Sequence, residues 1–337
     1  MQNPLFLLGS HKSGTSLLRS LLDGTPELFV IPVEAHFFQY GGYWVDYALR
    51  PARPADPSFD QLVDGYVSHL RQSNRSAPGT SDSALAGQWN LDAFETTLRD
   101  RGRAFFAAGN FKQFLDCYVA AMHVGLYGAP PATGRFVEKS VENAEYVLLL
   151  QRMYPGARFI HLVRNPYATL TSIRRHMRRG HFPFLGRALS ALYNSYYYLY
   201  KNPRLIPDYL VIRYEDLVTW PGDVMRIVAD FAGLEFAEHL LAPTVMGRPW
   251  GGNSTSGQQF TAVSARPLTG WQGAIHPLEV NFVNALFGHV LRDYGYERVE
   301  PAGSVYRPDR PEKPATYLAN RWLWRVVKQM GALPVMR

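Results

Sequence analysis

Short apolar runs alternate with amphipathic stretches along most of the chain. The run at 5–8 is continuously apolar, which is typical of a strand buried on both faces of a sheet. Further strands are predicted at 28–31, 135–140, 158–164 and 209–214. Between these runs apolar residues return every three or four positions, which is the period of a helix. Strands that alternate with helices predict an α/β fold with a parallel sheet flanked by helices.

The regular alternation is interrupted between about 40 and 130. Helical spacing recurs there at 59–70, 91–98 and 111–126, with no strand pattern between. We interpret this region as a helical insertion within a single domain that spans 1–300. Residues 301–337 have four prolines within 301–314, which is typical of a semi-rigid linker. They end in an amphipathic helix.

The loop after the first strand has the composition of a phosphate cradle. It contains two glycines, which allow a tight turn and a close approach of a ligand to the backbone. A helix then begins at Thr15, so its free N–H groups and the positive end of its dipole face the loop. The residues that would hold an anion there are Lys12, Ser13, Gly14, Thr15 and Ser16.

The spacing of this loop differs from that of nucleotide triphosphatases. Gly9 and Gly14 have the separation of the motif G-x-x-x-x-G-K-[ST], and Ser16 fills its hydroxyl position. However, Thr15 stands where the motif has lysine, and the lysine lies at position 12. The loop therefore lacks the lysine that reaches the outer phosphates of ATP.

A second candidate anion site follows the strand at 158–164. Arg164 ends this strand, where an unpaired guanidinium is costly, and its planar fork suits phosphate. Pro166 opens a helix on which Ser172 lies two turns in, able to face back toward Arg164. A local carboxylate as the partner of Arg164 is the alternative.

Taken together, these segments resemble the sulfotransferases that use 3′-phosphoadenylyl sulfate (PAPS). The resemblance covers 4–34, 135–233 and, more loosely, 268–296, and is strongest to the carbohydrate, tyrosyl-protein and bacterial branches. It implies that the loop around Lys12 holds the 5′-phosphosulfate, that Arg164 and Ser172 hold the 3′-phosphate, and that Tyr214 lies near the adenine. The Arg-Lys-Gly run that completes the 3′-phosphate site in the cytosolic branch is missing here.

The same resemblance implies catalytic roles for three residues. Glu34 matches the glutamate that removes the acceptor proton in several branches, and His36 is the rival base. Because Phe37 and Phe38 are apolar neighbours, we expect the pKa of Glu34 to be raised. Lys12 would neutralise the bridging oxygen as the S–O bond breaks, and Lys139 would contact the moving sulfonate.

Composition narrows the remaining possibilities. The chain has 337 residues, a formal net charge of +7 and 47% hydrophobic residues, which fits a globular protein with an anionic ligand. No dense basic block suggests nucleic acid, and no His, Asp and Glu set has metal-ligand spacing, so we predict neither nucleic acid nor metal as a partner. No apolar stretch is as long as a membrane span, and the first strand begins almost at Met1, so we predict a cytoplasmic protein.

Two features leave alternatives open. The last helix mixes tryptophans with Arg and Lys, so it could contact an anionic membrane, its own domain or a partner subunit. The acceptor could be a small molecule, carbohydrate, lipid or peptide, since the aromatic residues Phe37, Phe38, Tyr40, Tyr43 and Trp44 fit several of these.

PAPS-dependent sulfonate transfer to a hydroxyl or amine is the preferred function. A kinase-like transferase, whose Mg²⁺ ligand would be Glu215 or Asp216, and a nucleotide-binding protein without turnover are the alternatives.

Overall fold

The computed structural model describes residues 1–40, 57–75, 85–177, 182–252, 260, 262–301 and 313–330. Tyr43, Trp44 and most of the proline-rich segment after residue 301 lie outside these ranges.

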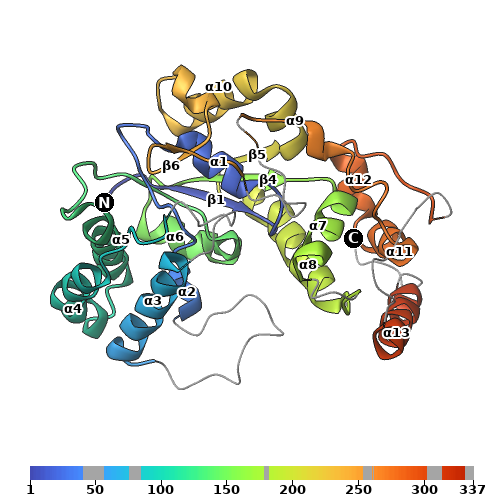
Figure 1. The fold of residues 1–337 in the computed structure, drawn as a ribbon, viewed down its shortest axis with the longest axis horizontal. Coiled ribbons are helices and arrows are strands. Elements are labelled where there is room, and N and C mark those ends of the chain that lie inside the picture. The colour runs from blue at the N-terminus through green and yellow to red at the C-terminus, as the bar shows by residue number, and fades with distance from the viewer. Residues whose placement is uncertain are drawn as a thin grey trace.

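A five-stranded parallel sheet lies at the centre of the molecule (Figure 1). Its strands, in the spatial order β2-β3-β1-β4-β5, are β2 (Phe29–Val30), β3 (Phe136–Glu138), β1 (Leu5–Gly9), β4 (Arg158–Val163) and β5 (Tyr209–Arg213). Each lies within one of the five runs predicted from the sequence or extends it by one residue. With helices on both sides, this sheet confirms the predicted α/β class.

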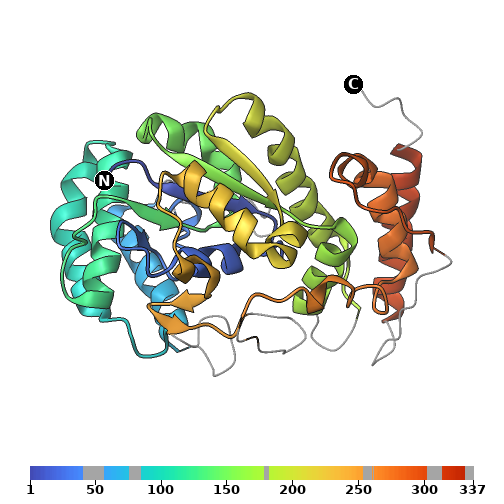
Figure 2. The ribbon, with the colours of Figure 1, turned by 90° about the horizontal axis from the view of Figure 1, so that it is seen from above.

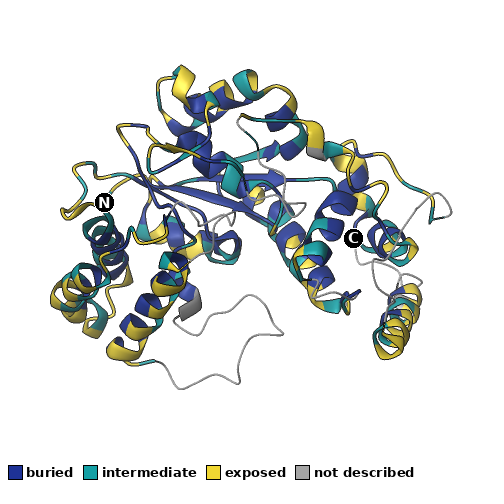
Figure 3. Ribbon diagram, viewed as in Figure 1, coloured by how far each residue is buried: buried dark blue, intermediate teal, exposed yellow. Residues whose placement is uncertain are grey.

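Both faces of the sheet are covered, which explains why its central strand is continuously apolar. Alternate residues of β1 face opposite ways. Leu5 and Leu7 pack into a core formed with α1 (Thr15–Leu22) and α10 (Pro221–Ala232). Phe6 and Leu8 pack into the core on the other face, which is formed largely by the insertion. The strands are accordingly buried along most of their length (Figure 3).

The insertion consists of three long helices beside the β2 edge of the sheet (Figure 1). They are α3 (Phe59–Asn74), α4 (Leu91–Ala107) and α5 (Phe111–Tyr127), and the short α2 (Phe37–Tyr40) precedes them. Ser58 begins α3 with a reciprocal cap, in which its hydroxyl accepts from the N–H of Gln61 and the Gln61 side chain accepts from the N–H of Ser58. Helices are thus present at the three positions predicted from the sequence, whereas the division into a single domain with an insertion and a boundary at 300 stays a prediction.

Helices beyond β5 form a third core. Its members are α7 (Pro166–Met177), α8 (Gly186–Lys201), α11 (Pro277–Leu286), α12 (Gly288–Asp293) and α13 (Pro314–Met330). Phe287 separates α11 from α12. Figure 2 shows α13 lying beside α11 and α12 at one end of the molecule.

The final helix, α13, packs on its own domain through one side only. Val327 is buried, and Leu323 and Trp324 pack against the same core. Leu318 and Trp322 are exposed on this helix. Among the described residues, no helix combines the length and apolarity that crossing a membrane requires.

The remaining elements are short connections. They are η2 (Val141–Tyr146), α6 (Val147–Met153), η3 (Asn202–Arg204), α9 (Tyr214–Thr219), η4 (Glu238–Leu241), β6 (Thr244–Val245), β7 (Arg248–Pro249) and η5 (Arg266–Leu268). Residues 141–153 are 3₁₀-helical as far as Tyr146 and α-helical afterwards.

Candidate active site

The loop between β1 and α1 is shaped by two glycines. Gly9 has φ of 148°, and a Cβ there would lie 2.7 Å from the carbonyl oxygen of Leu162. Gly14 has φ of 100° and begins α1, and a Cβ there would overlap the ring of Tyr214. Glycine is therefore required at both positions by backbone conformation and by space. Lys12, between them, also has a positive φ, of 67°.

The hydroxyls of this loop do not all face the same way. Ser13 is fully buried, and both its N–H and its Oγ donate to the carbonyl of Ser10, at 3.1 and 2.7 Å. Thr15 and Ser16 lie in the first turn of α1, where backbone N–H groups have no carbonyl partner within the helix. The available donors are thus those of the helix start and Lys12, whereas the side chain of Ser13 holds the turn.

Arg164 joins the second candidate anion site to the first. It follows β4, and one of its terminal nitrogens donates to the carbonyl of Lys12 at 2.8 Å. Its guanidinium lies 4.5 Å from the centre of the Tyr214 ring. Its buried Nε has no hydrogen-bond partner among the described residues, and no described carboxylate forms an ion pair with it. Arg164 is therefore not neutralised by a local acid.

Glu215 holds the segment that carries Tyr214. One carboxylate oxygen accepts from the N–H of Asn165 at 3.0 Å, and the other accepts from the hydroxyl of Tyr296 at 2.9 Å. These bonds connect the ends of β4 and β5 with the end of α12, and they position the ring of Tyr214 beside Arg164.

An acid–base cluster lies beyond the ends of β2 and β3. The ammonium of Lys139 donates to Oε1 of Glu34, and Nε2 of His36 lies 3.2 Å from Oε2 of the same carboxylate. Glu142 contacts two imidazoles, with its oxygens 3.8 Å from Nδ1 of His36 and 3.5 Å from Nε2 of His11. Glu34 and Lys139 are 105 positions apart in the sequence, and the parallel sheet brings them together.

One large cavity, of about 1040 Å³, collects nearly all of these residues. Its lining includes Lys12, Gly14, Thr15, Ser16, Glu34, Lys139, Arg164, Ser172 and Tyr214, which are all the predicted site residues except Ser13. Every strand of the sheet contributes through the segment after its carboxyl end, where ligands bind in open α/β sheets.

Comparison with known proteins identifies the family. A model of the sulfotransferase family matches residues 4–238. The chain belongs to the sulfotransferase family. It also resembles the sulfotransferase domain of the Synechococcus PCC 7002 olefin synthase, with 22% identity, 88% of this chain and 97% of that domain covered, and a TM-score of 0.50. The sulfotransferase domain from the curacin biosynthetic pathway gives 18% identity, coverage of 89% and 99%, and a TM-score of 0.51.

These two structures support the sulfotransferase fold of the chain. The match to the family model makes it a sulfotransferase family enzyme. No curated protein sequence matches the chain significantly.

The lining of the cavity in this sulfotransferase is basic. Glu34 is the carboxylate found among the described lining residues, whereas the cations are Lys12, Arg19, Lys139, Arg164, Arg175, Arg187 and Arg266. Charge of one sign in a cleft attracts a ligand of the opposite sign. Sequence reasoning missed the additional arginines, because each one alone looks like a surface residue on a helix or loop.

Sequence reasoning also placed two of the aromatic residues, Phe37 and Phe38, wrongly. Phe37 and Phe38 are buried in the core of the insertion and do not line the cavity. Trp250, Phe260 and Trp271 line it instead. They come from C-terminal segments whose approach to the site is set by the tertiary fold.

The pKa of Glu34 is shifted in the direction opposite to the one expected. Burial acts to raise it, but the charge of Lys139 and the hydrogen bond from His36 outweigh burial and hold the pKa well below its usual value. Lys139 is only 4% exposed, so it is no surface lysine. Burial, together with the charge of Lys139, lowers the pKa of Lys12.

The pKa values of the two histidines beside Glu142 are raised, whereas that of Glu34 is lowered. Burial alone would lower the pKa of His36, but the hydrogen bond with Glu34 and the charge of Glu142 raise it above its usual value. Burial likewise opposes a charged His11, and the hydrogen bond with Glu142 again gives a raised pKa. Sequence reasoning missed His11 and Glu142, although His11 lies in the predicted loop beside Lys12.

Hydrogen bonds from several elements hold the backbone of residues 34–37, the segment that carries Glu34. Three side chains of the insertion form hydrogen bonds with backbone carbonyls of residues 34–37. His69 bonds to the carbonyl of Glu34 at 2.7 Å, Tyr118 to that of Ala35 at 2.7 Å, and Tyr66 to that of Phe37 at 2.8 Å. The buried Glu138 accepts from the N–H of Ala35 at 3.1 Å. The insertion thus fixes the backbone position of Glu34.

A metal was not expected from the sequence, yet the fold brings potential ligands together. Atoms of Glu34, His36 and Glu142 lie within 4.8 Å of one another. Because the ammonium of Lys139 already neutralises Glu34, we assign this group to ion pairing.

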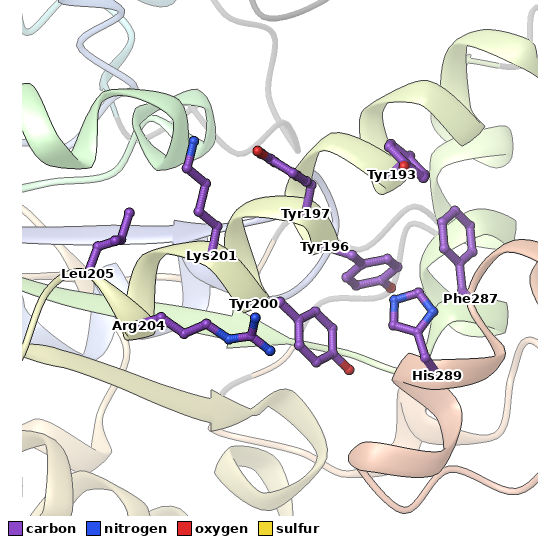
Figure 4. Close-up of a pocket in the computed structure, with 9 residues that line it drawn as sticks. All are labelled: Tyr193, Tyr196, Tyr197, Tyr200, Lys201, Arg204, Leu205, Phe287 and His289. Carbon is purple, nitrogen blue, oxygen red and sulfur yellow. The ribbon is translucent and has the colours of Figure 1, made fainter. Parts of the chain in front are cut away.

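A second cavity, of about 540 Å³, shares no lining residue with the first. Figure 4 shows four tyrosines of α8, with Phe287 and His289 opposite some of them. None of the predicted site residues lines it.

Proposed function

We propose that this enzyme transfers a sulfonate group from PAPS to an acceptor hydroxyl or amine and releases adenosine 3′,5′-bisphosphate. The observation that carries the proposal is the contact between Arg164 and the carbonyl of Lys12. This contact joins the two candidate anion sites, 152 residues apart in the sequence, and both Lys12 and Arg164 line the same cavity. A nucleotide charged at both its 5′ and 3′ ends fits two such sites, whereas ATP carries phosphates at one end only.

The residues present fit this nucleotide. The start of α1 and Lys12 would hold the 5′ end, and glycine at positions 9 and 14 leaves room for close approach. Arg164, whose buried Nε lacks a described partner, would hold the 3′-phosphate with Ser172. The ring of Tyr214 would lie near the adenine.

The acid–base cluster supports the chemical step. PAPS supplies the sulfonate, and Glu34 is positioned to take the proton of the acceptor. Lys12 would neutralise the charge that develops on the oxygen of the leaving phosphate, and Lys139 would contact the sulfonate. A sulfonate carries less charge than a phosphoryl group, so the lysines can supply what Mg²⁺ supplies in kinases.

A kinase-like function has less support. Both oxygens of Glu215 are engaged by Asn165 and Tyr296, and Asp216 lies 3.4 Å from the guanidinium of Arg213. Neither carboxylate is therefore free to bind Mg²⁺ in this arrangement.

The acceptor is proposed only as a class. Trp250, Phe260 and Trp271 provide flat apolar surfaces next to the cationic lining, which suits a ring-containing acceptor such as a sugar or a phenol.

Nucleotide binding gives the first test. We expect adenosine 3′,5′-bisphosphate to bind more tightly than adenosine 5′-monophosphate, which lacks only the 3′-phosphate, and Arg164→Gln to abolish this difference while affinity for the monophosphate is kept. Equal affinities in the wild-type enzyme, or tighter binding of ATP with Mg²⁺, would contradict the proposal.

Turnover gives the second test. Radiolabelled PAPS is supplied with a panel of phenols, sugars and amines, and Glu34→Ala should abolish transfer while nucleotide binding persists. Tight binding of adenosine 3′,5′-bisphosphate without transfer to any acceptor would instead indicate a nucleotide-binding protein.

A further inference from the structure

Glu34 alone is a poor base in this site. A general base works best when its pKa lies near the working pH, and the pKa of Glu34 is held well below the usual carboxylate value. A neighbouring group that receives the proton after Glu34 takes it would therefore favour the step. The residue in contact with the second oxygen of Glu34 is His36.

Each ring nitrogen of His36 faces a different carboxylate. Its Nε2 lies 3.2 Å from Oε2 of Glu34, and its Nδ1 lies 3.8 Å from Oε2 of Glu142. The imidazole is thus placed between two carboxylates, of which only Glu34 is the proposed base. Its backbone has φ of 49°, an unfavourable value for histidine, and its N–H donates to Oγ of Ser140 at 3.0 Å.

We propose that Glu34 and His36 act as one proton-accepting pair, and that Glu142 is the residue that orients the imidazole. This inference rests on the proposed sulfonate transfer. As the acceptor oxygen bonds to sulfur and the bond from sulfur to the 5′-phosphate oxygen breaks, the acceptor proton passes to Oε2 of Glu34 and on to Nε2 of neutral His36. The single N–H of neutral His36 is then on Nδ1, the nitrogen that faces Glu142, so Nε2 is free to accept. The leaving phosphate oxygen keeps the electron pair. Glu34 ends as a carboxylate, and the imidazolium lies between two carboxylates.

Electrostatics favours this end state. Although burial acts to lower the pKa of His36, the hydrogen bond with Glu34 and the charge of Glu142 raise it, so the imidazole binds a proton more tightly than usual. The charged and titratable groups around it come from four segments. They are Glu34 on its own segment, Glu138 at the end of β3 with Glu142 after it, His11 after β1, and His69 of α3, whose ring centre lies 5.0 Å away.

The pair predicts a distinctive pH dependence. Because His36 must be neutral to receive the proton, the rate should fall as the pH drops through the pKa of His36, above about 6.5. If Glu34 acted alone, the rate would hold until the pH fell below about 4.5, the usual carboxylate range. The pH at which kcat falls on the acid side, the acid limb of its pH profile, therefore differs by more than about two units between the two mechanisms.

Two experiments on the full-length enzyme test the pair. The first follows the imidazole Cε1–H signals by NMR during a pH titration, with and without adenosine 3′,5′-bisphosphate, and His36→Gln assigns the signal. We expect His36 to titrate above about 6.5, and its pKa to fall in both Glu34→Gln and Glu142→Gln. A value below 6.5, or no response to Glu142→Gln, would overturn the proposal.

The second experiment measures kcat against pH with an acceptor found in the panel. Glu142→Gln should move the acid limb to lower pH, and His36→Gln should move it to the carboxylate range and reduce kcat at least tenfold at pH 8. His11→Gln is the matched control, since His11 contacts Glu142 but not Glu34. A limb that disappears in His11→Gln and persists in His36→Gln would overturn the proposal.

The two failures are distinguishable. If wild-type enzyme transfers sulfonate with an acid limb near pH 4, the pair is refuted and the proposed function stands. If no sulfonate is transferred while His36 titrates as expected, the proposed function fails and the NMR result still describes the pair. Thermal unfolding of each variant checks that Glu142→Gln is folded.

Discussion

Replacing Gly14 by alanine should disturb the enzyme more than any ordinary glycine substitution. The new Cβ would overlap one ring atom of Tyr214 and lie 2.8 Å from another, which is closer than real carbon contacts allow. The backbone has φ of 100° as well, so alanine would be strained even in open space.

The magnitude follows from these two effects. A left-handed backbone costs alanine about 1–2 kcal/mol, and forcing an extra methyl into a packed contact costs about 1–3 kcal/mol. Gly14→Ala should therefore lower the free energy of unfolding by roughly 2–5 kcal/mol. The ring of Tyr214 can move only by leaving Arg164, so affinity for adenosine 3′,5′-bisphosphate should fall at least tenfold.

Gly24→Ala is the matched control. Gly24 has a φ of 81° but is exposed, and no atom lies within 4 Å of the point that an alanine methyl would occupy, so only the backbone cost of about 1–2 kcal/mol applies. Urea denaturation followed by tryptophan fluorescence measures stability, and isothermal titration measures binding. If the two variants were equally stable, and Gly14→Ala bound the nucleotide as tightly as wild type, the assigned contact between Gly14 and Tyr214 would be wrong.

Three further predictions concern charged groups. Arg164→Lys should weaken binding of adenosine 3′,5′-bisphosphate about tenfold in titration calorimetry, because lysine lacks the planar fork that binds phosphate; unchanged affinity would count against a 3′-phosphate site there. Arg174 and Glu279 form a buried ion pair, with Arg174 Nε 2.6 Å from Oε1, so Glu279→Gln should cost about 3–5 kcal/mol in urea denaturation, and a loss below 1 kcal/mol would contradict this. Because the pKa of Glu34 is lowered by folding, its contribution to stability is present above about pH 4.5 and is lost as the pH falls through the folded-state pKa; the difference in Tm between wild type and Glu34→Gln should therefore narrow in acid, and a constant difference would refute the pairing with Lys139.

The fold class and the family could be predicted because their signals are local. The apolar run at 5–8, the glycines around Lys12 and the Arg164-Asn165-Pro166 segment each fix a strand, a turn or a helix start from short-range preferences. Their order along the chain then specified a parallel sheet with anion sites at the strand ends, and the sheet confirmed this class. The site roles of Lys12, Glu34, Lys139 and Arg164 remain predictions.

The environment of each side chain could not be predicted in the same way. The apolar neighbours of Glu34 suggested a raised pKa, but Phe37 and Phe38 turn into the core, and the groups that contact the carboxylate are Lys139 and His36. Lys139 lies 105 residues away in sequence, so no local pattern reveals the pair.

The sequence by itself thus determined where the chain forms strands, glycine-containing turns and helix starts, since these depend on neighbouring residues and on the conformations that glycine and proline allow. Only the tertiary structure decided which charges meet. A pKa depends on burial and on charges within a few ångströms, and those distances arise when the parallel sheet brings the ends of distant strands to one edge.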